Sequence, residues 1–291
     1  MEIAAYITLG LLSVCALAPF ALLIIASFTD ERVAVRDGFT FAPAKWSMAA
    51  FEFIAKDWSV LGRAYGVTLF VAVVGTTVSL LLTSMLAYAL SRDGLPGRRI
   101  LSFIVIFTML FNGGIVSTYF VYSNILHIKD TIWAQIVPYL LMTAFNVILV
   151  KNYFTNNIPT AMIESAHLDG ASELQIFTRI VLPVSLPILA TVGLLTFIGY
   201  WNDWTNGLYF LTGGAGAKYY SIQNVLNQIQ QNITFLANNS SNTTAGINVS
   251  QLPSTTIRMA MALVAILPIL VLYPFFSKFF VKGITLGSVK E

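Results

Sequence analysis

The sequence is poor in charged residues, in cysteine and in histidine, and each shortage excludes a class of protein. Charged side chains make up 10% of the 291 residues, whereas a soluble domain has roughly 25%. The single cysteine, Cys15, cannot form an internal disulfide or a multi-cysteine metal site. His127 and His167 have no partners at metal-ligand spacing, so we expect no metal site and no catalytic residue.

Nucleotide and nucleic-acid signals are missing as well. The chain contains neither a GxxxxGK loop followed by Ser or Thr nor a GxGxxG run, so we expect it to bind no nucleotide cofactor itself. Its basic residues are scattered, and its net charge is only +3. Without a basic patch, nucleic acid is not an expected partner.

Long apolar runs are what the sequence has in excess. Hydrophobic residues make up 57% of the chain, and about 20 mostly apolar residues suffice to cross a bilayer. These runs lack the period-two alternation of a β-barrel, so we predict an all-α integral membrane protein. Gly75 and Gly193 allow close helix contact, and Pro138 and Pro187 predict kinks. The predicted spans are residues 3–28, 65–90, 100–122, 132–150, 182–201 and 257–281.

Basic residues in the short loops predict the orientation. Loop 91–99 carries three arginines, whereas loop 123–131 carries only Lys129. Because short basic loops stay in the cytoplasm, both termini and loop 151–181 are predicted to be cytoplasmic. Total counts do not decide the orientation, because loop 29–63 also has five basic residues. On this prediction the chain, 1–291, is one transmembrane domain with extracytoplasmic loops 29–63 and 202–256.

A polar segment, residues 158–187, interrupts the apolar pattern and carries several residues that typically start or end helices. Pro159 suits the first turn of a helix, and Gly170 after Asp169 allows a left-handed reversal. Ser172 and Gln175 then have capping-box spacing for a second helix. A helix–turn–helix beside a membrane predicts contact with a cytoplasmic partner.

This segment resembles the EAA loop of ABC-transporter permeases, the membrane subunits of binding-protein-dependent importers. The family pattern reads E-A-A-x-x-x-G, an apolar stretch, then I-x-L-P. Here it stands as Glu164-Ser165-Ala166, Gly170 and Ile180-Val181-Leu182-Pro183. The resemblance implies a coupling helix that docks on a cytoplasmic ATPase subunit through Glu164, Ser165, Ala166, Asp169, Gly170 and Ala171. A capped cytoplasmic helix without a partner is the alternative.

Aromatic and amide side chains gather at the end of the fifth predicted span, in Tyr200, Trp201, Asn202, Asp203 and Trp204. Such residues suit a carbohydrate path, but an interfacial aromatic belt explains them as well. The sequence is also similar here, and at Phe280–Lys290, to carbohydrate-importing permeases of the MalG-like and LplC-like branch. Polar residues within the other spans mark either a pathway or interhelical hydrogen bonds: Asn112, Tyr119, Tyr139 and Asn146.

The resemblance implies a six-helix, type I importer permease in the bacterial cytoplasmic (inner) membrane. The implied partners are a homologous second permease, two ATPase subunits that bind ATP and Mg, an extracytoplasmic binding protein, membrane lipid and an oligosaccharide. Acidic glycans such as alginate fragments fit this branch as well as neutral ones. An importer of another solute remains the alternative. A channel or secondary carrier is disfavoured, because the spans lack an ionisable set.

Overall fold

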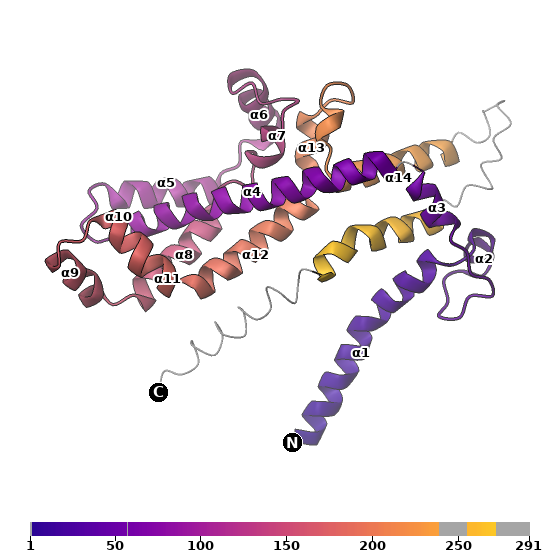
Figure 1. The fold of residues 1–291 in the computed structure, drawn as a ribbon, viewed down its shortest axis with the longest axis horizontal. Coiled ribbons are helices and arrows are strands. Elements are labelled where there is room, and N and C mark those ends of the chain that lie inside the picture. The colour runs from indigo at the N-terminus through magenta and orange to yellow at the C-terminus, as the bar shows by residue number, and fades with distance from the viewer. Residues whose placement is uncertain (1, 57, 239–254, 272–291) are drawn as a thin grey trace. The chain divides into compact units, whose positions relative to one another are not determined.

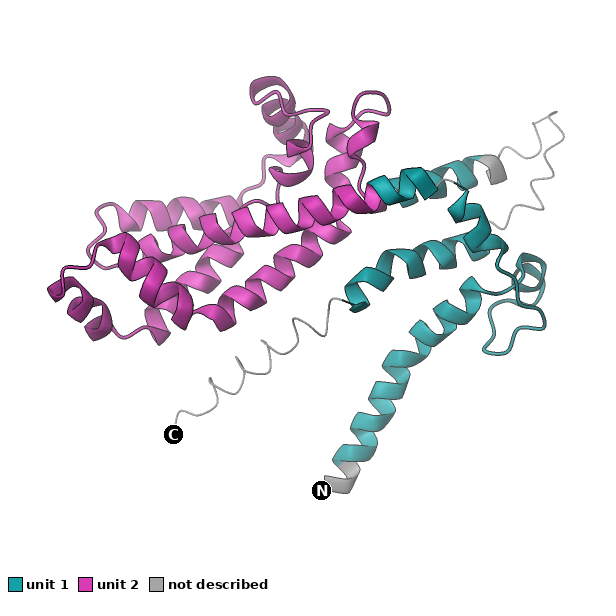
Figure 2. Ribbon diagram, viewed as in Figure 1, with its two compact units in different colours: residues 1–63, 225–271 teal, residues 64–224, 272–291 magenta. Residues whose placement is uncertain are grey.

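The computed structural model describes residues 2–56, 58–238 and 255–271, and these residues are largely helical (Figure 1). They divide into two units (Figure 2). Unit 1 comprises residues 1–63 and 225–271, and unit 2 comprises residues 64–224 and 272–291, each considered over its described positions. The second half of the sixth predicted span and the Phe280–Lys290 ending lie outside the described residues.

Unit 1 contains one long apolar helix, one shorter apolar helix and two short helices between them in sequence. It holds α1 (Glu2–Ser27), α2 (Glu31–Asp37), α3 (Ala49–Ala55) and the helix Thr255–Val271. The Glu31 carboxylate accepts hydrogen bonds from the N–H groups of Thr255 and Thr256, at 2.9 and 2.8 Å. A carboxylate at this position caps the helix start, where backbone donors lack intrahelical partners.

Unit 2 carries the elements of functional interest. Two helices, α4 (Trp58–Ser91) and α14 (Ile222–Asn238), begin or end in the other unit. The remaining elements of unit 2 are α5 (Arg98–Leu110), α6 (Gly114–Phe120), π-helix η1 (Val121–Ile125), α7 (Trp133–Ile136), α8 (Ala144–Asn157), α9 (Thr160–Leu168), α10 (Glu173–Ile176), π-helix η2 (Phe177–Val181), α11 (Leu182–Val184), α12 (Leu186–Asn202), α13 (Thr205–Phe210) and 3-10 helix η3 (Ala217–Tyr219).

Close packing of α4 on α12 depends on glycine, as the sequence predicted. A Cβ atom on Gly75 of α4 would lie 2.5 Å from Cζ of Tyr200 on α12. One on Gly193 would lie 3.0 Å from Cδ1 of Leu80. Larger residues at these two positions would therefore force the helices apart.

The predicted spans are interrupted more often than composition suggests, and the count of six is not confirmed. Among the described residues, only α1 and α4 contain continuous helices long and apolar enough to cross a membrane. Two bent pairs raise this number to four: α5 with α6–η1, bent by 119°, and Glu173–Val184 with α12, bent by 80°. Residues 100–122 and 132–150 are therefore not continuous helices, and Thr255–Val271 is a shorter one.

Local chemistry explains these breaks. The Asn112 side chain accepts a 2.9 Å hydrogen bond from the N–H of Gly114, whose φ is +77°. This is an Asx turn at a left-handed glycine, which ends a helix even in an apolar run. The 80° bend falls at Ser185, between Pro183 and Pro187, where the helical ladder loses donors. Asn112 therefore makes the turn that divides the apolar run 100–122.

Candidate functional site: a punctuated helix pair and a pocket at the end of α12

The polar segment folds as the sequence predicted, into α9, a reversal and α10. Gly170 adopts φ +80°, and the N–H of Ala171 donates a 2.9 Å hydrogen bond back to the carbonyl of Ala166. Ser172 and Gln175 form the capping box, with Gln175 Oε1 accepting from the N–H of Ser172 at 2.8 Å. These bonds satisfy backbone groups at both helix ends and hold the two helices at a defined angle.

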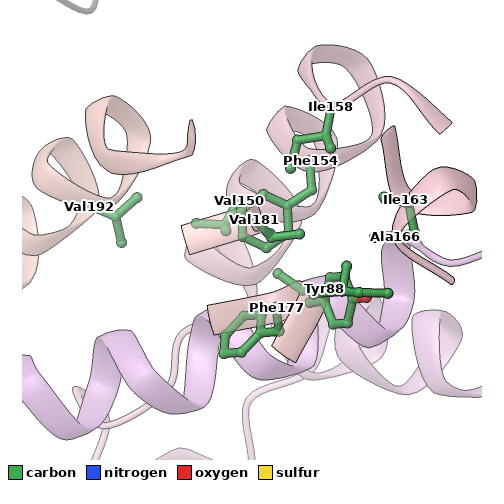
Figure 3. Packing of buried hydrophobic residues seen from close by; sticks show 11 residues of the cluster. Tyr88, Val150, Phe154, Ile158, Ile163, Ala166, Phe177, Val181 and Val192 are labelled. Atoms are coloured by element: carbon green, nitrogen blue, oxygen red, sulfur yellow. The ribbon is translucent and has the colours of Figure 1, made fainter. Parts of the chain in front are cut away.

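One face of α9 belongs to the core of unit 2. Ile163 and Ala166 are buried in a cluster that also contains Val150 and Phe154 of α8 and Phe177 of η2 (Figure 3). Ala166 is only 8% exposed. Ala171, half-buried, packs against the same cluster. In this structure these two alanines therefore serve packing within the chain.

The opposite face of α9 and the following turn are exposed. Glu164, Ser165, Asp169 and Gly170 all lie on it. Leu168 is 90% exposed, and Leu174 on α10 is 65% exposed. Single exposed leucines are common on protein surfaces, so the interest of these two lies in their place on the segment that resembles the EAA loop. We call this surface, Glu164, Ser165, Leu168, Asp169, Gly170 and Leu174, the outer face of the helix pair.

The residue types of the EAA pattern did not single out Leu168. The helical spacing of Leu168 relative to its neighbours could have identified it as exposed. Ile163 and Ala166 lie three residues apart on one helical face, and Leu168 follows two residues later, on the opposite side. Sequence periodicity therefore contained a signal for this apolar side chain.

A pocket of about 330 Å³ opens at the other end of the unit, where α12 ends. Its lining comes from Tyr139, Leu140, Gly199, Asn202, Asp203, Trp204, Thr205 and Asn206. A second pocket of about 340 Å³ shares Leu140 and Gly199 with it and includes Asn146. The structure therefore brings five of the candidate path residues together along two neighbouring pockets.

Four other candidates lie elsewhere. Tyr200 and Trp201 are buried at 2% exposure, and the Tyr200 hydroxyl donates to the Ile136 carbonyl at 2.8 Å. Tyr119 stacks on Phe210 outside the pocket, with ring centroids 5.9 Å apart. Asn112 makes the helix break described above. Helical periodicity explains why the pocket takes only part of the Tyr200–Trp204 run, since consecutive residues point in different directions.

Asp203 and Asn206 give the pocket its polar end. Oδ1 of Asp203 accepts hydrogen bonds from the N–H groups of Thr205 and Asn206, at 3.0 and 3.3 Å, and so starts α13. Asp203 Oδ2 and Asn206 Oδ1 are buried, and neither has a hydrogen-bond partner within the described part of the chain. Burial raises the pKa of Asp203 to about 6, and the two N–H groups together with the Asn206 side chain offset only part of this effect.

The backbone around the pocket is held by side-chain amides. Residues 137–143, between α7 and α8, are not helical, and Tyr139 has φ +62°. Asn206, 1% exposed, donates to the Pro138 carbonyl at 3.1 Å. Gln135 donates to Asn224 Oδ1 at 3.0 Å. Irregular backbone within a membrane protein needs such partners, because lipid offers none.

Across residues 2–56, 58–238 and 255–271, no three His, Cys, Asp or Glu side chains are grouped so that they could hold a metal ion.

The relatives of this chain are membrane transport proteins. Residues 79–286 match the family described as "Binding-protein-dependent transport system inner membrane component". The polygalacturonan/rhamnogalacturonan transport system permease protein YtcP of Bacillus subtilis (strain 168) is 40% identical over 277 residues, covering 95% of this chain and 93% of that protein. Protein LplC of the same organism is 36% identical over 282 residues, covering 97% and 92%.

A solved structure shares the fold. A chain from the crystal structure of a bacterial ABC transporter involved in the import of the acidic polysaccharide alginate aligns with a TM-score of 0.77. The two sequences are 28% identical, and the alignment covers 96% of each chain.

Proposed function

Because this chain belongs to the family of binding-protein-dependent transport system inner membrane components, we propose that it is a permease subunit of an ATP-driven importer of oligosaccharides. Transport of polygalacturonan and rhamnogalacturonan by one relative, and of alginate by the solved transporter, supports acidic glycans as its substrates. The permease itself is non-catalytic, and ATP with Mg is hydrolysed by two partner subunits. A second permease and an extracytoplasmic binding protein complete the machine.

The outer face of the helix pair carries the proposal. Its two exposed leucines and the flanking carboxylates of Glu164 and Asp169 suit a groove that is apolar at its floor and basic at its rim. The opposite face of α9 is packed in the core, so a pull on the outer face moves the bundle with it. This is how a partner's ATP cycle would switch the permease between inward-facing and outward-facing states.

The six-span arrangement follows as part of this proposal. The two continuous apolar helices and the two bent pairs supply four spans. Residues 132–157, broken at 137–143, and the helix beginning at Thr255 supply the other two. With both termini and the helix pair in the cytoplasm, α13 and the pocket at the end of α12 lie on the extracytoplasmic side of the membrane.

The two neighbouring pockets are the proposed glycan path. Trp204 and Tyr139 offer ring faces to a sugar, and Asn202 offers an amide. The unpaired oxygens of Asp203 and Asn206 can accept hydrogen bonds from sugar hydroxyls, which would remove a cost of burying them. Among the described lining residues of the two pockets there is no Lys or Arg. Hydroxyls are therefore the sugar groups that this path recognises.

Reconstitution of the whole complex tests the proposal. The chain would be co-expressed with its cognate permease and ATPase subunits, and placed in liposomes with the binding protein. We expect oligogalacturonides or alginate oligomers to stimulate ATP hydrolysis and to accumulate in the lumen. Maltooligosaccharides and an amino-acid mixture serve as controls. Stimulation by amino acids alone, or no association with an ATPase subunit, would contradict the proposal.

A further inference from the structure

A polar link joins α9 to the bundle alongside its apolar inner face. The carboxylate of Glu173, at the start of α10, has its two oxygens on two different elements. Oε1 lies 3.2 Å from Nε2 of His167 on α9. Oε2 accepts a 2.5 Å hydrogen bond from the hydroxyl of Tyr88 on α4. One side chain thus connects the coupling helix to α4, the longest helix among the described residues.

The tyrosine end of this link is held firmly. Tyr88 is nearly buried, and its ring packs on Phe177 with centroids 5.3 Å apart. The guanidinium carbon of Arg92 lies 5.9 Å from the ring centroid, within the range of a cation–π contact. Because the ring is enclosed on these sides, its hydroxyl has a fixed direction. A displacement of Glu173 is therefore opposed by α4 and not absorbed by rotation of Tyr88.

The link differs in kind from the contacts around it. Apolar contacts such as those of Ile163 and Ala166 are non-directional, and they allow two surfaces to slide by a fraction of an ångström. Hydrogen bonds weaken steeply with distance and angle, so they fix one register. A charged acceptor makes the bond to Tyr88 stronger than a neutral one would be. The geometry assigns the register of α9 against α4 to this carboxylate.

We propose that Glu173 is a positioning residue for energy coupling, which transmits the movement of α9 to α4 through Tyr88. This inference rests on the proposed function, because it needs an ATPase that moves α9. It concerns residues that the EAA pattern does not specify, since Glu173 falls in the stretch between Gly170 and Ile180 and Tyr88 lies on another predicted span. Docking of the ATPase is assigned to the outer face, and transmission to this link.

A double-mutant cycle in the reconstituted complex tests the link. The variants are Tyr88→Phe, Glu173→Gln and both together, and the readout is glycan transported per ATP hydrolysed. The glycan is an oligogalacturonide or an alginate oligomer, whichever stimulates the wild-type complex more. We expect each single variant to lower this ratio by about fivefold, as for loss of a charge-assisted hydrogen bond that is partly open to water. The double variant should fall no further than Glu173→Gln alone.

The matched control is Tyr153→Phe. Tyr153 packs against the same apolar cluster, and its hydroxyl makes no hydrogen bond within the described part of the chain. This control should keep the wild-type ratio. In every variant the ATPase subunits should co-purify as they do with the wild type, because the outer face is unchanged.

The outcomes separate the two proposals. Wild-type protein that binds no ATPase, or transports no glycan, would refute the proposed function. A wild type that works, together with Tyr88→Phe and Glu173→Gln variants of unchanged ratio, would refute the link alone. Additive losses in the double variant would refute it too. If the Glu173→Gln complex fails to assemble, the ratio measured for Tyr88→Phe tests the link instead. That variant removes only the hydroxyl oxygen and keeps the aromatic ring. Failure of Tyr88→Phe to retain the ATPase would also overturn the assignment.

Discussion

Truncation of Leu168 should separate the proposed docking of the ATPase from folding of the permease. Leu168 is 90% exposed, so Leu168→Ala removes almost no contact within the chain. The free energy of unfolding should change by less than about 0.5 kcal/mol, as for other surface substitutions. If the side chain is instead buried in a groove of the ATPase, its loss weakens that complex.

The size of the loss follows from the carbons removed. Each buried CH₂ group contributes about 0.8 kcal/mol, and leucine exceeds alanine by three carbon atoms. Incomplete burial in the groove reduces the sum to about 2 kcal/mol, which corresponds to roughly a 30-fold weaker dissociation constant. Ala166→Leu, on the buried face of the same helix, should instead destabilise the permease by overpacking.

The assay is a titration of purified ATPase subunit onto the permease pair in nanodiscs. Leu126→Ala is the matched control, because Leu126 is 51% exposed and lies on the predicted extracytoplasmic side of the membrane, away from the ATPase. The control should bind the ATPase as the wild type does. An affinity of Leu168→Ala within twofold of the wild type, with folding intact, would refute the assignment of the outer face.

Three further predictions concern the fold and the pocket. Gly170→Ala should destabilise the helix pair by about 1 kcal/mol, because φ is +80° there, and an unchanged melting temperature would contradict the assigned reversal. Gly75→Val should lower the free energy of unfolding by about 2 kcal/mol, because the new side chain displaces Tyr200. Gly66→Val is the control in the same thermal unfolding assay and should lower it much less, because nothing lies within 4 Å of a Cβ atom there. Asp203 has a folded pKa of about 6, above its ordinary 3.8, so the stability that its protonated form confers is complete below pH 3.8 and is lost as pH rises through 6. Asp203→Asn should therefore stabilise the protein at pH 7.5 by about 2 kcal/mol but hardly at pH 4, and equal shifts at both pH values would refute the burial argument.

Prediction from sequence succeeded where the signal is local. The reversal at Gly170 and the capping box of Ser172 and Gln175 depend on residues within a few positions of one another. Both appear in the structure as predicted. The family resemblance on Glu164-Ser165-Ala166 and Gly170 is confirmed by the match over residues 79–286. Gly75 and Gly193 also lie at close helix contacts, as small residues in spans predict.

Hydropathy located the apolar runs but not the extent to which backbone geometry interrupts them. The stretch 100–122 is apolar enough to cross a membrane, yet the Asn112 turn and Gly114 divide it. The stretch 132–150 is divided near Pro138 and Tyr139. Hydropathy averages over a window, so it does not register one residue with positive φ. The break in 132–150 is stabilised by residues far along the chain. Asn206 and Tyr200 donate hydrogen bonds to the carbonyls of Pro138 and Ile136, which have lost their helical partners.

The structure places only part of the Tyr200–Trp204 run at the pocket, for a related reason. Residue type proposed Tyr200 and Trp201 for a glycan path, but packing turned both into the bundle and left Asn202, Asp203 and Trp204 at the pocket. Asn206, which completes the polar end, carries only the weak signal of following a capping Asp203 by three residues. The face of a helix that lines a pocket is set by the elements packed around the helix. Residue type alone does not reveal which face that is.

By itself, the sequence determined the membrane class of this protein, the family and the punctuation of the α9–α10 helix pair, because hydropathy, turn chemistry and caps act over short distances along the chain. Tertiary structure alone decided which part of the Tyr200–Trp204 run lines a pocket, which distant side chains bond the interrupted backbone, and which side chains share a carboxylate. Tyr88 and Glu173 are 85 positions apart. Their contact exists because α4 and α10 pack together, and packing is a property of surfaces that the folded chain creates.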